Sequence, residues 1–121
     1  MLTGSKYTRI LTVGAKIRGS TEISMATLIK LLRKEIRAKE WVSLDVETDA
    51  NPDMMQQKLV SIQLAFGNTA VFAVTDDPRE IVEVLLSKKA VVVAHNMKFD
   101  YQILRLHGAK ELIRVKDTMI M

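Results

Sequence analysis

The segment that most constrains the fold of this chain is residues 41–48, WVSLDVET. Its apolar and polar residues alternate, and alternation with a period of two is typical of a β-strand with one buried face. In such a strand Leu44 and its aliphatic neighbours face one side, whereas Asp45 and Glu47 face the other. The segment therefore predicts a core strand over residues 41–47 whose second face carries two adjacent carboxylates.

The close spacing of Asp45 and Glu47 implies electrostatic repulsion between their carboxylates. Two neighbouring carboxylates disfavour each other's ionisation unless a cation lies between them. A divalent cation that prefers oxygen ligands, such as Mg²⁺ or Mn²⁺, would remove that repulsion. An exposed edge strand with two solvated acids accounts for the same residues without a ligand, and the pair alone does not distinguish these interpretations.

Composition narrows the class of protein. A chain of 121 residues is long enough for one domain. The absence of cysteine excludes disulfides, thiolate metal sites and a cysteine nucleophile. No apolar run reaches the roughly 18 residues of a membrane span, and no signal peptide is evident, so we expect a cytoplasmic protein without a membrane partner. The net charge of +4 is compatible with a nucleic-acid partner, although a solvated basic helix face explains it more simply.

The pattern along the chain predicts an α/β fold. Gly67-Asn68 indicates a tight hairpin, and the apolar run 90–94 indicates a central strand parallel to 41–47, reached by a helical crossover. Ser24 and Asp77 are expected as helix N-caps, and Asp117 as the N-cap of a further helix. The expected strands cover 7–13, 41–47, 59–66, 70–75, 90–94 and 112–115, and the expected helices cover 24–38, 77–87 and 96–107.

A third acid follows the strand 90–94. Asp100 lies in the first turn of the next helix, where the helix dipole alone would favour a carboxylate by up to about 1 kcal/mol. The carboxyl ends of parallel strands meet at one edge of a sheet, where ligands bind in α/β folds. We therefore expect Asp100 to converge with Asp45 and Glu47. His95 could be a metal ligand, but a capping or packing role is simpler.

The remaining candidates have simple structural explanations. Asn96 fits an N-cap, and Phe99 fits the core side of its helix. Trp41 is expected to be buried or to shield the strand, and His107 has no identifiable partner.

Two motifs carry a resemblance to a known family. Residues 44–48 (LDVET) and 95–100 (HNMKFD) resemble the first and second motifs of the DEDD 3′–5′ exonucleases, and residues 117–119 (DTM) resemble the segment that follows. The pattern is similar to the proofreading domain of family A DNA polymerases, such as DNA polymerase I, and to ribonuclease D. The resemblance covers about residues 40–121. It implies a single domain over 1–121 with a ribonuclease H-like mixed sheet, in which 1–39 supply an N-terminal strand and helix.

The resemblance also implies residue roles. Asp45 would bridge two cations, Mg²⁺ or Mn²⁺, while Glu47 would bind the cation on the nucleophile side and Asp100 the other. The substrate would be a single-stranded nucleic-acid 3′ end, DNA in preference to RNA, although the residues themselves do not separate the two. The residues implied in substrate binding are Leu44, Thr48, Asn96 and Phe99.

The family's third motif, with a fourth metal-binding acid, has no counterpart in this sequence. We therefore expect a C-terminally truncated domain with an exposed apolar sheet patch, an incomplete two-metal site and weak or absent activity. Activity would return if another chain supplied the motif. One alternative is a catalytically silent nucleic-acid-binding module. Another is an oligomer, or a complex with a second chain, in which the partner covers the exposed sheet.

Overall fold

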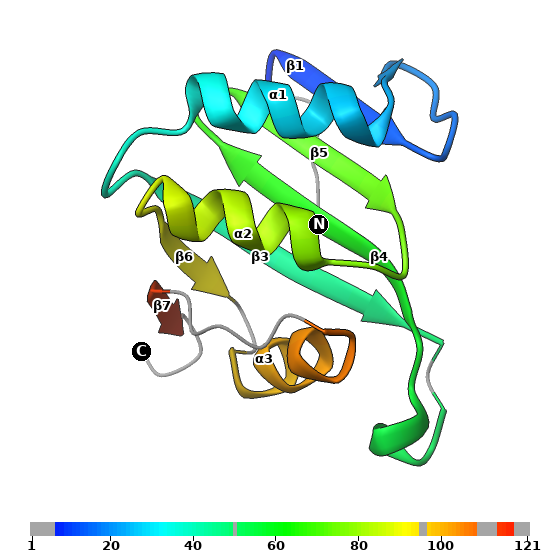
Figure 1. Ribbon diagram of the computed structural model, residues 1–121. Helices are drawn as coiled ribbons and strands as arrows, with labels where there is room; N and C mark the ends of the chain where they lie inside the picture. Colours follow the sequence, from blue (N-terminus) through cyan, green and yellow to red (C-terminus); the bar gives the residue numbers. More distant parts are fainter. Residues whose placement is uncertain (1–6, 50, 95–96, 109–113, 118–121) are drawn as a thin grey trace.

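The computed structural model describes residues 7–49, 51–94, 97–108 and 114–117. Its described strands form a seven-stranded mixed sheet in the order β2-β1-β5-β4-β3-β6-β7, as Figure 1 shows. The elements are β1 (Arg9–Val13), β2 (Thr21–Glu22), α1 (Met25–Glu35), β3 (Trp41–Thr48), a 3₁₀ turn (Met54–Gln56), β4 (Leu59–Phe66), β5 (Thr69–Val74), α2 (Arg79–Ser87), β6 (Val91–Ala94), α3 (Met97–Leu106) and β7 (Arg114–Asp117).

The pairing of β3 confirms the predicted α/β sheet. β3 runs antiparallel to β4 and parallel to β6. β4 returns through a turn at Gly67-Asn68 to pair with β5, and the positive φ of Gly67 (+55°) is one that glycine adopts without a Cβ clash. α2 connects β5 to β6, which is the predicted crossover.

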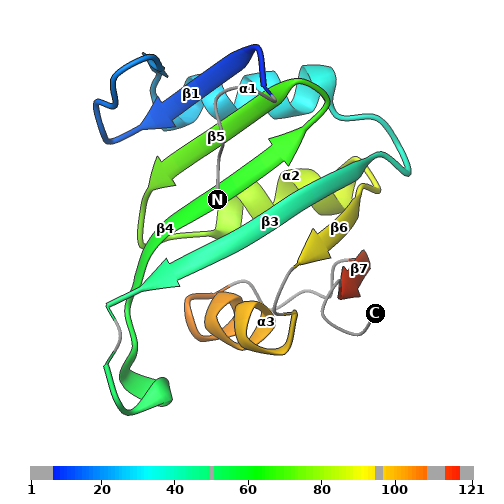
Figure 2. The same ribbon diagram turned by 180° about the vertical axis from the view of Figure 1, so that it is seen from behind.

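α1 and α2 lie against one face of the sheet, as Figures 1 and 2 show from opposite sides. The side chains that β3 and β4 turn toward this face are buried, including Val42, Leu44, Ile62 and Leu64. Burying each such side chain contributes about 1.5–3 kcal/mol, so this face and the two helices form the main core. Among the described residues no helix covers the opposite face of β1, β5 and β4 (Figure 2).

α3 occupies a different position. β6 pairs with β3 only over residues 41–43, so it does not extend along the second half of β3. α3 packs against β3, β6 and β7, and in both views it lies beyond the end of β6, beside the second half of β3. The last turn of α3 lies at the end of β3, because His107 binds Leu59, the partner of Thr48.

Helix boundaries differ in detail from the predictions. Ser24 is confirmed as the N-cap of α1, because its Oγ accepts the Thr27 N–H at 3.1 Å. α1 ends at Glu35, three residues early, because the chain is already extended at the C-cap, Ile36. At α2 the N-cap is Pro78, and Asp77 instead accepts the Arg79 N–H at 3.1 Å.

The predictions for the C-terminal segment are tested only in part. Asp117 is the last residue of β7, where it pairs with Ala94 of β6, and the helix that it was predicted to cap lies outside the described residues. β7 starts at Arg114, and the predicted start of this strand at 112 lies outside the described residues. Trp41 is 61% exposed, so its prediction as a core residue is wrong, whereas the alternative shielding role stays a prediction. Trp41 lies on the face of β3 opposite the core, which the described helices leave open.

The expected apolar patch is limited in the described residues. Trp41 and Val74 are exposed on the open face, but they lie on different strands. Gln63 lies on β4, the strand between them, and Ser43 follows Trp41 on the same face of β3. No helix in the described part of the chain is long and apolar enough to cross a membrane.

Candidate active site

Asp45 and Glu47 lie on the same face of β3, as the alternation predicts. Asp45 is partly buried and Glu47 is exposed, whereas the residues between and beside them are buried on the core face. Their cross-strand partners on β4 are Gln63, opposite Asp45, and Ser61, opposite Glu47. Polar side chains on both strands therefore surround the two carboxylates.

The carboxylate of Glu47 is held by β4. Ser61 Oγ donates a hydrogen bond to Glu47 Oε1 at 3.2 Å, and Gln63 Nε2 donates to the same oxygen. Hydrogen bonds to a carboxylate are stronger than those between neutral groups. Because both bonds fall on Oε1, they orient the carboxylate without using Oε2.

Asp100 belongs to the buried side of α3. Its side chain is 4% exposed, and Ile103 and Leu104 of the same helix are buried as well. Aspartate is almost never fully buried without a partner group. α3 packs against β3, so the helix of Asp100 neighbours the strand of Asp45 and Glu47.

The sequence did not indicate a structural role for His107. The Leu59 N–H donates to His107 Nε2 at 2.9 Å, and Nδ1 lies 2.8 Å from the Ile103 carbonyl oxygen. A backbone N–H can only donate, so Nε2 is the acceptor and Nδ1 carries the proton. His107 therefore ties the end of α3 to the first residue of β4, and its only sequence signal is its position at the end of a predicted helix.

A compact loop borders the end of β3. Thr48 Oγ1 donates to Gln57 Oε1 at 3.0 Å, and Gln57 Nε2 donates to the Asn51 carbonyl at 2.8 Å. Asp49 Oδ1 accepts the N–H groups of Lys58 and Asn51, and these bonds lower the pKa of Asp49. Thr48, implied in substrate binding, therefore lies at a well-defined edge of the site.

The other predicted residues are placed as follows. The Leu44 side chain is 2% exposed on the core face, so it is turned away from the acids. Phe99 is partly buried against the core, as expected. His95 and Asn96 lie outside the described residues.

The three acids lie on elements that pack against each other, but their side chains are not arranged as a metal site. No group of three or more histidine, aspartate or glutamate side chains within the described ranges is placed to hold a metal ion. The structure brings Asp45 and Glu47 onto one face and Asp100 onto the adjoining helix, while the Glu47 carboxylate is held by β4. Their roles as metal ligands stay a prediction.

Comparison with solved structures supports the fold. The catalytic core of RRP6 from Trypanosoma brucei is 17% identical with a TM-score of 0.67, covering 92% of this chain and 29% of that one. Escherichia coli RNase D is 20% identical with a TM-score of 0.59, covering 78% of this chain and 25% of that one. The EXO domain of Aedes aegypti Nibbler is 10% identical with a TM-score of 0.64, covering 98% and 56%. At these identities the similarities show the ribonuclease H-like fold alone, and the chain spans less than a third of RRP6 and RNase D.

Sequence comparison gives the family. No curated protein sequence matches the chain. The family model described as 3′-5′ exonuclease matches residues 20–121, which include β3 with its two acids and α3 with Asp100. This chain therefore belongs to the 3′-5′ exonuclease family that this model describes.

Proposed function

We propose that this chain removes nucleotides from the 3′ end of a single-stranded nucleic acid in a reaction that depends on divalent cations. One observation supports the proposal: α3, which carries the buried Asp100, packs against β3, the strand that presents Asp45 and Glu47 on one face. The three acids therefore belong to two elements that are in contact with each other.

The chemistry of these side chains fits Mg²⁺ or Mn²⁺. Both cations prefer oxygen ligands, and the described candidates are all carboxylates. Glu47 keeps Oε2 available to a cation, because Ser61 and Gln63 both bind Oε1. Bound cations would activate water for attack on the phosphodiester and stabilise negative charge on its oxygens. Asp45, Glu47 and Asp100 would hold the cations, and β4 would keep Glu47 oriented.

The choice of DNA over RNA as the substrate is also a proposal. We infer a DNA 3′ end, as in the proofreading domain of DNA polymerase I type that the two motifs resemble. RNase D, which has a similar fold, is instead described as an exoribonuclease involved in structured RNA processing, so the same assay must compare DNA and RNA.

The experiment follows 5′-labelled DNA and RNA single strands of one sequence during incubation with Mn²⁺. We expect products that shorten stepwise from the 3′ end, faster for DNA, and at least a hundredfold loss in Asp45→Asn. Glu83→Gln is a matched control, because it removes an exposed carboxylate from α2. Cleavage by Asp45→Asn at the wild-type rate would refute the assignment.

A further inference from the structure

Cationic charge is gathered at one end of the molecule. Residues 30–40 and 87–89 hold seven cationic and two acidic side chains, a net charge of +5, whereas the rest of the chain sums to −1. We call this region the basic end. Its exposed cations are Lys30, Arg33, Lys34, Arg37, Lys39 and Lys89.

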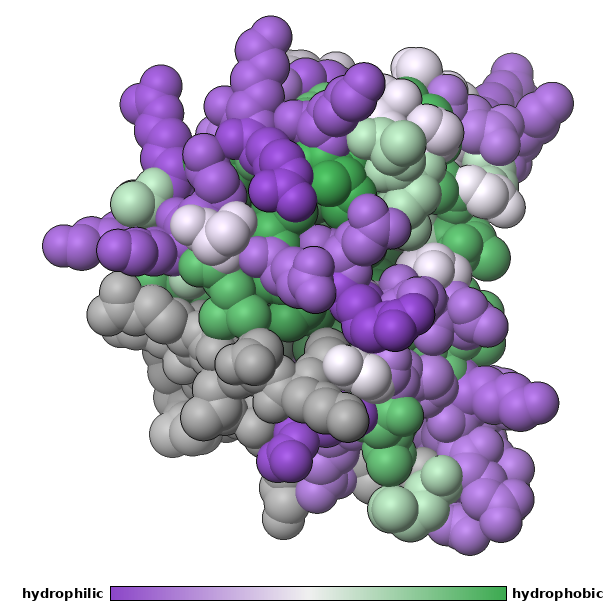
Figure 3. Space-filling view, viewed as in Figure 1, coloured by the Kyte–Doolittle hydropathy of each residue, from purple (hydrophilic) through white to green (hydrophobic). Residues whose placement is uncertain are grey.

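The basic end is built from two loops that contact each other. The Lys39 N–H donates to the Lys89 carbonyl at 2.9 Å, and the Val91 N–H donates to the Glu40 carbonyl at 2.8 Å. The end of α1 and the loop after α2 lie at the same side of the molecule, on the left of Figure 1. Long hydrophilic side chains project from that side in Figure 3.

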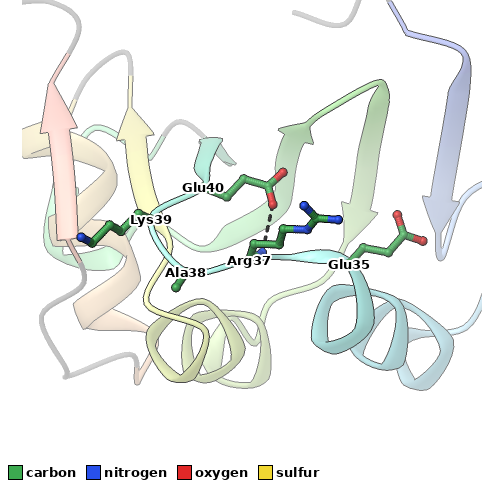
Figure 4. A pocket seen from close by; sticks show the side chains of 5 residues that line it. All are labelled: Glu35, Arg37, Ala38, Lys39 and Glu40. Atoms are coloured by element: carbon green, nitrogen blue, oxygen red, sulfur yellow. Dashed lines mark hydrogen bonds between the residues drawn. The ribbon is translucent and has the colours of Figure 1, made fainter.

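Both acids of this region bind groups within the fold. Glu35 accepts two hydrogen bonds from the Arg9 guanidinium, at 3.0 and 2.5 Å, and Glu40 Oε1 accepts the Arg37 N–H at 2.9 Å. Figure 4 shows the hollow around these residues, with Lys39 extending away from Glu40. Among the described residues the salt bridges are Arg9–Glu35 and Arg79–Asp77, so the cations of the basic end are not neutralised by them.

Two of these lysines adopt a backbone conformation that favours glycine. Lys39 has a φ of +66° and Lys89 has a φ of +56°. A residue with a Cβ pays a steric cost there, and glycine does not. The chain therefore has a lysine at both contacting turns, where glycine would fit the backbone better.

We propose that the basic end binds the phosphate backbone of the nucleic-acid strand, upstream of the 3′ terminus that is cleaved. Lys39 lies in the turn before β3, six residues from Asp45, so at most roughly 20 Å of extended chain separates them. About six nucleotides of a stacked single strand cover that distance. A strand of about 20 nucleotides can therefore reach from the basic end to the acids. The inference rests on the proposed function for the identity of the polyanion and for the position of its 3′ end.

The test is the double variant Lys39→Gly/Lys89→Gly, which removes two charges and suits both turns. Fluorescence anisotropy measures binding of a labelled DNA strand of about 20 nucleotides in EDTA, where no metal-dependent cleavage occurs. We expect about tenfold weaker binding near 0.1 M salt and a salt slope reduced by about 1.4, or 0.7 for each lost phosphate contact. The melting temperature should not fall, which excludes unfolding as the cause. The matched control, Lys16→Gly/Arg18→Gly, removes two exposed cations from the β1–β2 loop.

Unchanged affinity and salt slope in the Lys39→Gly/Lys89→Gly protein would overturn the inference, as would an equal loss in the control. Binding to phosphatidylserine vesicles without binding to DNA would also overturn it, because the partner would then be a membrane. If DNA binding depended on Lys39 and Lys89 while Asp45→Asn still cleaved DNA at the wild-type rate, the nuclease assignment would be rejected. The assignment of the basic end as a DNA-binding surface would still hold.

Discussion

Replacing His107 by alanine should release the end of α3 from β4. The imidazole accepts the Leu59 N–H at 2.9 Å and donates to the Ile103 carbonyl, and Leu59 is 2% exposed. The alanine variant therefore leaves the Leu59 N–H without its protein acceptor.

The magnitude follows from these contacts. Each hydrogen bond contributes about 0.5–1.5 kcal/mol, and an unsatisfied buried N–H costs about 1–3 kcal/mol. We expect His107→Ala to lower the free energy of unfolding by about 2–4 kcal/mol. For a chain of this size, such a loss lowers the melting temperature by about 10 °C.

Urea unfolding followed by circular dichroism measures this loss at pH 7.5. His107→Gln is the matched variant, because its amide oxygen can accept the Leu59 N–H, and it should recover part of the stability. A loss below about 0.5 kcal/mol in His107→Ala would refute the reasoning. Equal instability of the alanine and glutamine variants would show that packing, and not the hydrogen bond, holds α3.

Three further predictions concern local structure. Ser24→Ala should lower the free energy of unfolding by about 1 kcal/mol in urea, because it removes the acceptor of the Thr27 N–H. Gly108→Ala should cost about 1–2 kcal/mol in the same assay, since Gly108 has a φ of +101° and an added Cβ would lie 3.0 Å from Arg79 Cδ. Hydrogen bonds from Arg79 lower the pKa of Asp77 from 3.8 to about 2, so its contribution is present at neutral pH and lost as the pH falls through about 2. Asp77→Asn should therefore be slightly less stable than wild type at pH 7, by under 1 kcal/mol, with equal stability near pH 1.5.

The strand pattern was predictable because side-chain alternation is a local property. β3, the hairpin at Gly67 and the parallel β6 all follow from short runs of sequence. The same local rule placed Asp45 and Glu47 on one face.

Features that depend on contacts between distant segments were not predictable. The His107–Leu59 hydrogen bond joins residues 48 positions apart, and nothing near either residue signals it. Trp41 was expected to be buried because tryptophan is large and apolar, but its face of β3 carries no described helix. The orientation of Glu47 likewise depends on Ser61 and Gln63, whose register is set by the β3–β4 pairing.

The central claim is that Asp45, Glu47 and Asp100 hold divalent cations at the edge of the sheet. Isothermal titration calorimetry with Mn²⁺ tests it most directly, because it does not require turnover. We predict Mn²⁺ binding by the wild-type chain that weakens at least tenfold in Asp45→Asn and is unchanged in Glu83→Gln. Equal Mn²⁺ affinity of wild type and Asp45→Asn would contradict the claim.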